Sequence, residues 1–322
     1  MLPFFVVALA VIYMAWNIGA SDVANYLSAA IGTRALGLKK GMALGAIFGF
    51  AGALLLSRPV VNTIAFNIIP QQQQTIAGGL VIILSAAFLL TLASYKGLPI
   101  STTQAIRGAI LGFGLAKASA VNWSTIILIA TSWIVAPIAG IGLGFVFYWL
   151  IRHTLIKKTR GLLQREGAER KFAMWQIISA TTLIFVFAAN DIAGAFGIFL
   201  AVEVPNFLMI QILACIAFAI GILTFGARII ETMTRRMLTR EMTPARGFAA
   251  QLAGIVIVLF FNQIAGIPLS TTQVAVTTIM GAGLVGGLKK LNWRIIGEIL
   301  TSWLLILPLS AALTFVLTAI FL

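Results

Sequence analysis

The chain of 322 residues is 61% hydrophobic and only 9% charged, with a formal net charge of +14. Soluble domains carry roughly 25% charged residues, so this composition excludes a water-soluble globular protein. The basic residues lie between apolar runs instead of along one face, which excludes a nucleic-acid partner and indicates that they set a membrane topology.

Several long windows of the sequence carry no charge, among them 118–151 and 247–288. A helix needs roughly 20 apolar residues to cross about 30 Å of hydrocarbon, and these windows supply them. The sequence therefore predicts an all-α polytopic protein that crosses a lipid bilayer many times. We expect it in the cell (plasma) membrane.

The first apolar run, 1–33, contains Asp22, and the later run 172–202 contains Asp191, the only other aspartate in the chain. A carboxylate at membrane depth costs about 3 kcal/mol or more, so we interpret both as functional and expect a bound cation to offset that cost. At about 1.5 Å per residue the first run would reach about 50 Å as one helix, so a break or a strong tilt is expected. The residues around the aspartates that favour unwound backbone are Gly19, Ser21 and Asn25 in one run, and Asn190, Gly194 and Gly197 in the other.

Next along the chain, GLPISTTQ begins at Gly97, and GIPLSTTQ begins at Gly266 in the second half. We expect Pro99 and Pro268 to interrupt the backbone, and a new helix to begin near the serine that follows each. The start of such a helix presents unpaired N–H groups and the positive end of its dipole, which together form an anion site; plain N-capping is the alternative. The predicted anion-binding residues are Ser101, Thr102, Thr103 and Gln104, and Ser270, Thr271, Thr272 and Gln273.

A single arginine follows the first of these stretches. Arg107 lies six residues beyond Ser101, and its counterpart in the second half is Val276. We group Arg107 with the anion-binding residues because a cation at this depth can contact the anion. Pairing with an aspartate and a purely structural role stay open.

The motifs occur twice at a near-constant spacing. The aspartates and the STTQ stretches are 169 residues apart, and the NW and TSW motifs that follow are 170 residues apart. The sequence therefore predicts a first membrane repeat at 1–151, a basic cytoplasmic linker at 152–171 and a second membrane repeat at 172–322.

The distribution of basic residues predicts how the repeats are oriented. If the linker lies in the cytoplasm and every apolar stretch crosses, nearly all lysines and arginines fall on the cytoplasmic side. If the STTQ stretches dip in and return, many more fall outside. We therefore predict about ten crossings, extracytoplasmic termini, and two repeats of inverted topology with broken helices at the midplane, as secondary transporters have.

The stretches GASDVAN from Gly19 and AANDIAG from Ala188, with the two GxPxSTTQ stretches, resemble the paired signatures of the inorganic phosphate transporter (PiT) family. The resemblance covers both halves of the chain, with four motifs in the family's order. It implies a symporter that imports inorganic phosphate with sodium or protons, and that is not an enzyme. It implies no cofactor besides bound sodium, and both a monomer and a homodimer stay open.

The resemblance also implies roles for single residues. Those implied in ion and substrate coordination are Asp22, Asn25, Asn190 and Asp191, with sodium at the two aspartates, while the STTQ serines and threonines bind the anion. Four positions depart from the family pattern: Ser21 and Gly194, where asparagine is usual, and Gln104 and Gln273, where histidine is frequent. These departures leave the coupling ion open and, because the superfamily includes sulfate permeases, partly the anion.

Sulfate is the nearest rival substrate. Phosphate near neutral pH carries a proton that an aspartate can accept, whereas sulfate requires only donors, so the aspartates favour phosphate and Arg107 favours sulfate. An intramembrane aspartic protease is the alternative from another class, since two carboxylates can share a proton. A protease gives no role to the STTQ stretches or to the duplication. A passive anion channel leaves the buried carboxylates unexplained.

Overall fold

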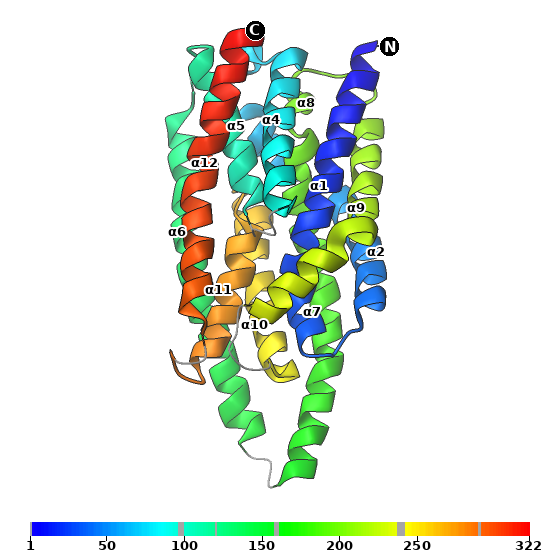
Figure 1. Cartoon of the computed structure of the whole chain (residues 1–322), viewed down its shortest axis with the longest axis vertical. Coiled ribbons are helices and arrows are strands. Elements are labelled where there is room, and N and C mark those ends of the chain that lie inside the picture. Colours follow the sequence, from blue (N-terminus) through cyan, green and yellow to red (C-terminus); the bar gives the residue numbers. More distant parts are fainter. Residues whose placement is uncertain (1, 96–99, 120, 158–160, 237–241, 289–290) are drawn as a thin grey trace.

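The computed structural model describes residues 2–95, 100–119, 121–157, 161–236, 242–288 and 291–322, which form helices and no strand (Figure 1). The helices are α1 (Leu2–Gly32), α2 (Leu38–Leu56), α3 (Arg58–Phe66), η1 (Gln71–Gln73), α4 (Ile76–Tyr95), α5 (Thr102–Ala116), α6 (Trp123–Ile151), η2 (Arg152–Ile156), α7 (Leu162–Phe196), α8 (Ile198–Ala201), α9 (Phe207–Arg236), α10 (Pro244–Val258), η3 (Leu259–Ile264), α11 (Thr271–Leu284) and α12 (Trp293–Phe321). Eight helical segments among them are long and apolar enough to cross a membrane. The predicted all-α class is confirmed. The interruption expected at Pro99 concerns a position outside the described residues, as do Lys96, Lys289 and Lys290 among the basic residues that predict the topology.

The two aspartate runs are continuous helices. α1 passes through Asp22 as one helix of 31 residues, and α7 passes through Asp191 as one helix of 35 residues. A helix break near these aspartates, which the sequence left open beside a tilt, is therefore wrong. Unbroken helices satisfy every interior N–H and C=O group locally, which is the least costly arrangement at membrane depth.

The small residues near Asp22 serve other purposes than unwinding. A Cβ atom at Gly19 would overlap the carbonyl oxygen of Phe218, so this glycine lets α1 and α9 approach closely. The Ser21 hydroxyl donates to the carbonyl oxygen of Asn17 at 2.9 Å, one turn back, which an intact helix accommodates.

The chain is interrupted at the STTQ stretches instead. α4 and α5 form a helical hairpin, because Gly78 near the start of α4 faces the Phe113 ring near the end of α5. α10, which continues as the π-helical turn η3, forms the second hairpin with α11. At about 1.5 Å per residue, α5 and α11 are each about 22 Å long, which is short of the hydrocarbon thickness. The count of ten crossings is therefore not confirmed.

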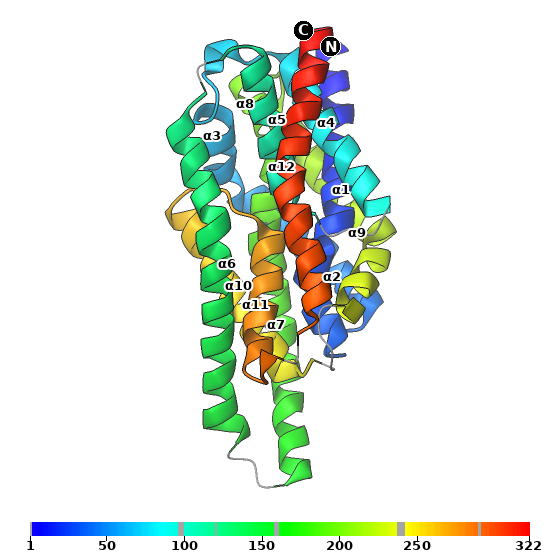
Figure 2. The ribbon, with the colours of Figure 1, turned by 60° about the vertical axis from the view of Figure 1, so that its left-hand side comes forward.

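The two hairpins enter the bundle from opposite ends. The arms of the first lie at the end that holds both termini, where Lys117 Nζ donates to the Leu322 carbonyl at 2.8 Å. The arms of the second lie at the end that holds segment 152–171, where Arg152 Nη1 donates to the Val285 carbonyl at 2.7 Å (Figures 1 and 2). The broken helices of the fold are these hairpins, and they point toward each other.

Helices of one half pack on helices of the other in exchanged pairs. α1 packs on α9 and α7 on α2, while α5 packs on α12 and α11 on α6. A Cβ atom at Gly52 would overlap the Phe185 carbonyl oxygen, and one at Gly221 would overlap that of Trp16. Both residues of the second pair lie 169 positions from their counterparts, so the internal repeat extends into the packing.

The same exchange occurs between the hairpins and the long helices. A Cβ atom at Gly112 in α5 would overlap the Ala311 carbonyl oxygen in α12, and one at Gly281 in α11 would overlap that of Ile141 in α6. These close approaches need glycine, because any side chain would strike the backbone of the neighbouring helix. The two halves therefore have equivalent helix interfaces.

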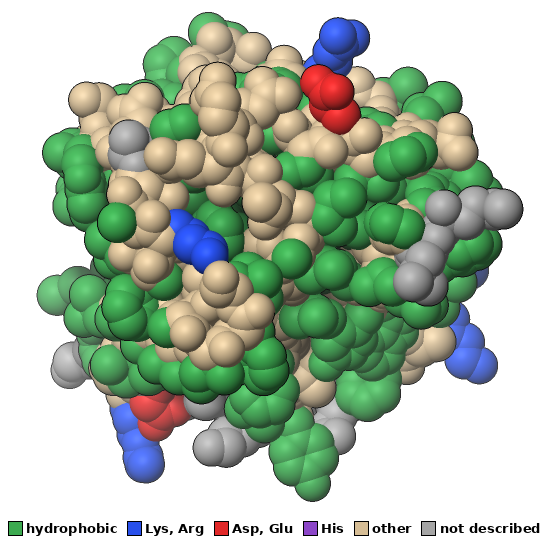
Figure 3. All heavy atoms as spheres, turned by 90° about the horizontal axis from the view of Figure 1, so that it is seen from above, with side chains coloured by type: hydrophobic (Ala, Val, Ile, Leu, Met, Phe, Trp, Pro, Cys, Tyr) green, Lys and Arg blue, Asp and Glu red, His purple; other side chains and the backbone are tan. Residues whose placement is uncertain are grey.

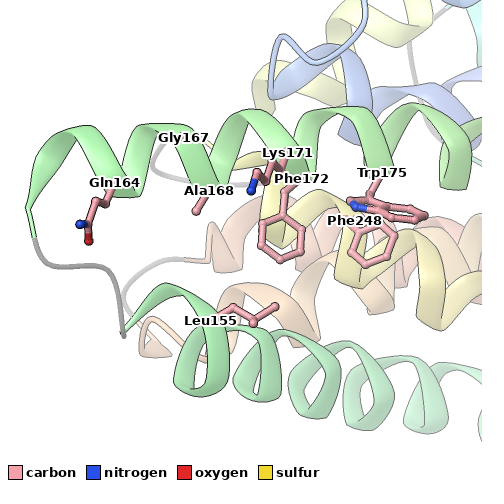
Figure 4. Close-up of a pocket in the computed structure, with 8 residues that line it drawn as sticks. All are labelled: Leu155, Gln164, Gly167, Ala168, Lys171, Phe172, Trp175 and Phe248. Carbon is pink, nitrogen blue, oxygen red and sulfur yellow. The ribbon is translucent and has the colours of Figure 1, made fainter.

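The described residues of the predicted linker, 152–157 and 161–171, are mostly helical. α6 continues into the π-helical turn η2, and α7 begins at Leu162, so two helical arms project beyond the bundle (Figures 1 and 2). A mainly apolar cleft of about 700 Å³ lies where these arms meet α10. It is lined by Leu155, Gln164, Gly167, Ala168, Lys171, Phe172, Trp175 and Phe248 (Figure 4).

The end of the molecule that carries both termini shows few charged side chains. Seen from that end, hydrophobic side chains and uncharged groups cover most of the surface (Figure 3). The termini and segment 152–171 lie at opposite ends, as the charge distribution predicts (Figure 1). Which end faces the cytoplasm stays a prediction.

Candidate functional site

The tips of the two hairpins touch in the middle of the bundle. Ser101 Oγ and Ser270 Oγ lie 2.8 Å apart, and both side chains are buried. Each serine also caps its own helix, since Ser101 Oγ accepts from the Gln104 N–H at 3.2 Å and Ser270 Oγ from the Gln273 N–H at 3.3 Å. The predicted helix starts are confirmed, and N-capping accompanies the contact between them.

The start of each helix still offers N–H donors. The first N–H groups of an α-helix have no intrahelical acceptor, and the serine caps satisfy only those of Gln104 and Gln273. The N–H groups of Thr102, Thr103, Thr271 and Thr272 belong to the first turns of α5 and α11. Two helix N-termini therefore direct donors and positive dipole ends toward one region.

Each hairpin binds the aspartate of its own repeat. Thr102 Oγ1 donates to Asp22 Oδ2 at 2.7 Å, and Thr271 Oγ1 donates to Asp191 Oδ1 and Oδ2 at 2.8 and 2.9 Å. Both carboxylates are 1% exposed. Because each threonine hydroxyl has one proton and gives it to a carboxylate, these two hydroxyls are not free to donate to an anion in this arrangement. They couple the anion region to the aspartates.

The two predicted asparagines lie in the same cluster. Asn25 Nδ2 donates to Asp22 Oδ1 at 3.3 Å and to Thr272 Oγ1 at 2.9 Å, so it connects α1 with the hairpin of the other half. Asn190 Nδ2 donates to Asp191 Oδ1 at 2.9 Å and to the Leu269 carbonyl at 3.0 Å. Asn190 Oδ1 also accepts from the Leu269 N–H at 3.3 Å, which holds the backbone just before Ser270.

Tyr26 belongs to the cluster although it was not predicted from the sequence. Its ring is fully buried, and its hydroxyl donates to Asp191 Oδ2 in a hydrogen bond that joins α1 to α7. The signal was available, since Tyr26 directly follows Asn25 in a run of small residues, and a hydroxyl at that depth needs a partner. The partner itself follows only from the packing of the two halves.

Gln104 and Gln273 are buried at equivalent positions of α5 and α11. Among the described residues, neither side-chain oxygen has a hydrogen-bond partner. A buried amide oxygen without a donor is costly, so both can accept a proton donor that enters the site.

Arg107 is 2% exposed and lies one turn and a half into α5. In the part of the chain that the structure describes, none of its three guanidinium nitrogens has a hydrogen-bond partner, and no carboxylate lies within salt-bridge distance of it. Asp191 is the carboxylate that acts on it electrostatically. Nη1 of this guanidinium lies 3.4 Å from the position of a Cβ atom built on Gly194, one turn beyond Asp191.

The oxygen atoms around the aspartates are suitable ligands for a hard cation. They are carboxylate, amide and hydroxyl oxygens, which Na⁺ shares with other cations that prefer oxygen ligands. Within the described ranges, no group of three or more histidine, cysteine, aspartate or glutamate side chains is placed to hold a metal ion. The oxygen ligands of the cluster thus fit a hard cation better than a transition metal that prefers nitrogen or sulfur ligands.

Comparison with known proteins agrees with this chemistry. A family described as "Phosphate transporter family" matches residues 18–314 of this chain. The Arabidopsis thaliana protein named "Inorganic phosphate transporter 2-1, chloroplastic" is 29% identical over 96% of this chain and 70% of its own length. A solved structure named "The sodium-dependent phosphate transporter" superposes with a TM-score of 0.90 and 26% identity, over 99% of both chains.

Proposed function

The chain belongs to the phosphate transporter family, and from that premise we propose that it is a symporter that imports inorganic phosphate with sodium or protons. The observation that carries the proposal is the contact between two STTQ hairpin tips, each bonded to a buried aspartate. An enzyme active site would not need this duplicated arrangement. The proposed membrane is the plasma membrane, with both termini extracytoplasmic.

The anion site of the proposal lies between the hairpin tips. N–H groups of two helix starts can bind oxygens of a tetrahedral anion from two sides, since both tips meet at Ser101 and Ser270. The side-chain oxygens of Gln104 and Gln273 supply buried acceptors nearby. Phosphate near neutral pH carries a proton for such an acceptor, whereas sulfate does not. This favours phosphate.

Cation coupling follows from the charge of the site. A phosphate anion beside Asp22 and Asp191 is repelled unless cations or protons neutralise the carboxylates, and in a low-dielectric interior this repulsion amounts to several kcal/mol. Cation binding removes the repulsion, so cation and anion raise each other's affinity by the same factor. Because the similar solved structure is that of a sodium-dependent transporter, Na⁺ is the first ion to test at Asp22 and Asp191.

Inverted repeats give this site a transport cycle. The hairpins enter from opposite ends, and the helix interfaces of the two halves are exchanged. Rocking of one repeat against the other would open the hairpin tips alternately toward each end, which is the general scheme of transporters with inverted repeats. The inverted topology and the rocking motion are parts of the proposal.

Sulfate transport is the second candidate, and Arg107 is the observation that favours it. A permanent cation near the anion region compensates for the absence of a substrate proton. Phosphate stays the first candidate because both buried carboxylates and both glutamine oxygens are acceptors.

Uptake into vesicles tests the proposal. The full chain is reconstituted, and radiolabelled phosphate uptake is measured under an inward sodium gradient, an inward proton gradient and neither, with unlabelled sulfate as competitor. We expect concentrative phosphate uptake under one of the two gradients and weak competition by sulfate. Uptake that no cation gradient drives would contradict symport. Stronger inhibition by sulfate than by unlabelled phosphate would indicate that sulfate, and not phosphate, is the substrate.

A further inference from the structure

The two aspartate sites differ on one side. In the first repeat, Asn25 stands one turn beyond Asp22 and donates to it. The counterpart of Asn25 in the second repeat is Gly194, which has no side chain to offer Asp191. The two hairpins also differ at the positions that correspond to each other. Ile106 and Arg107 of the first hairpin face Gly194, and their counterparts in the second hairpin are Ala275 and Val276.

The three differences compensate one another in space. A Cβ atom at Gly194 would overlap Ile106 Cδ1 and would lie 3.4 Å from Arg107 Nη1. The first hairpin therefore fills the volume where an asparagine side chain at position 194 would begin. In the other half, Ala275 is small and Val276 is neutral, so the equivalent volume is left to the Asn25 side chain.

The group that fills this volume carries a permanent charge. An arginine stays protonated in proteins, and a buried charge without a partner is strongly unfavourable. Arg107 is buried, and its guanidinium nitrogens have no hydrogen-bond partner among the described residues, while Asp191 is the carboxylate that acts on it electrostatically. A fixed positive charge thus lies beside Gly194, one turn beyond Asp191, whereas the equivalent position of the other hairpin, Val276, carries none.

We propose that Arg107 is a tethered cation that takes the place of an exchangeable cation at the Asp191 site, so that only the Asp22 site binds and releases a coupling cation. This inference rests on the proposed symport. Asp22 keeps the asparagine and has no facing arginine, so it needs a cation from solution. Asp191 has its counter-charge built into α5. One phosphate is then carried with one cation fewer than a pair of equivalent sites would require.

A variant that restores the symmetry of the two sites is the sharpest test. Ile106→Ala, Arg107→Val and Gly194→Asn together give the second site the residues that the first site has, and they remove the side chains that an asparagine would strike. Arg107→Val alone removes the charge without supplying the asparagine. Arg107→Lys keeps the charge and is the matched control.

The measurements are the sodium dependence of phosphate uptake by the reconstituted full chain and ²²Na⁺ binding to the purified protein; if protons drive uptake, the external pH is varied instead of sodium. We expect a Hill coefficient of about 1 for the original chain and for Arg107→Lys, and of about 2 for the triple variant. Arg107→Val should lower phosphate uptake at a given sodium concentration by about 10-fold or more, because the Asp191 carboxylate loses its counter-charge and repels the anion.

The outcomes separate this inference from the proposed symport. Uptake by the original chain that depends on no cation contradicts both. Cation-dependent uptake with two exchangeable cations per phosphate in the original chain overturns only the role of Arg107, and this result requires no variant. An active triple variant with an unchanged Hill coefficient overturns it as well.

Discussion

The internal repeat is preserved at the helix interfaces but only in part in the aspartate cluster. At the interfaces the halves are interchangeable: Gly52 against Phe185 has its equivalent in Gly221 against Trp16. In the cluster the Asp–Thr bonds are repeated, but Tyr26 donates to the second aspartate, and Arg107 has a valine as its counterpart in the other half. Packing therefore preserves the duplication, whereas the chemistry of the site has departed from it. In the proposed transport cycle, equivalent interfaces would let the two halves move against each other, and unequal sites would give each aspartate a different role.

The largest expected effect comes from removing either carboxylate charge. Asp22→Asn and Asp191→Asn should each lower concentrative phosphate uptake by at least about 100-fold, because Asp22→Asn removes the carboxylate that holds the coupling cation and Asp191→Asn leaves the buried Arg107 charge without its counter-charge. The two should differ in binding: phosphate binding to Asp22→Asn should lose its sodium dependence, while Asp191→Asn should keep it. Uptake assays and equilibrium binding of labelled phosphate at varied sodium measure both.

The matched control is Glu298→Gln, which removes an acid that is half exposed and pairs with Arg294 at 3.4 Å. Its uptake should equal that of the original chain. Concentrative uptake by both aspartate variants with unaltered ion dependence would show that the carboxylates are structural.

The equivalence of the helix interfaces is tested by adding one methyl group at each of two glycines that correspond in the two halves. Gly52→Ala and Gly221→Ala each place a Cβ atom against a backbone carbonyl oxygen, so we expect a loss of about 2 kcal/mol of stability in both. Gly142→Ala in α6 is the control, because a Cβ atom there would meet nothing within 4 Å. Thermal unfolding of the purified variants in detergent measures the effect, and a much larger loss for one glycine than for its counterpart would break the equivalence.

The third test separates the two Asp–Thr bonds. Among the described residues Thr102→Val removes the closest donor to Asp22, which then keeps the longer bond of 3.3 Å from Asn25. Thr271→Val removes a donor from Asp191, which keeps Tyr26 and Asn190. We expect a decrease of about 30-fold in uptake for Thr102→Val and about 10-fold for Thr271→Val.

Thr131→Val provides the control for these valine substitutions. Thr131 is exposed on α6, and its hydroxyl bonds only the Ile127 carbonyl of the same helix, so its uptake should not change. A larger loss for Thr271→Val than for Thr102→Val would reverse the predicted order of the two sites.

The sequence predicted the parts of the site that both halves share. Asp22, Asp191 and the STTQ stretches recur at one spacing, and a repeated polar group in an apolar run has few structural explanations. The bonds between the aspartates and the STTQ threonines were not predicted, because they depend on how the helices pack. The helix starts at Ser101 and Ser270 were also predictable, because proline and serine are local signals.

The sequence could not predict contacts that occur once or that depend on helix packing. Gly19 has the same local preference whether it unwinds α1 or admits α9, and only the position of Phe218 decides between them. The hairpin form of the STTQ stretches was missed for a similar reason, since positive-charge counting places loops and cannot detect a tip buried in the protein. Tyr26 has no counterpart to reveal it, because position 195 is an alanine.

The smallest expected effect belongs to this unpaired tyrosine. Tyr26→Phe keeps the buried ring and removes one donor from Asp191, which retains bonds from Thr271 and Asn190. A hydrogen bond to a charged group contributes about 1.5 kcal/mol or more when its loss leaves the acceptor unsatisfied, and less when other donors remain. We therefore expect phosphate uptake to fall by about 3-fold to 5-fold, with no change in the number of coupling cations. Tyr13→Phe on the same helix is the control, because the Tyr13 hydroxyl bonds Thr91 Oγ1 at 2.5 Å, outside the cluster. If Tyr26→Phe changes uptake no more than Tyr13→Phe does, the second aspartate does not depend on α1, and the difference between the two sites reduces to Arg107 and Gly194.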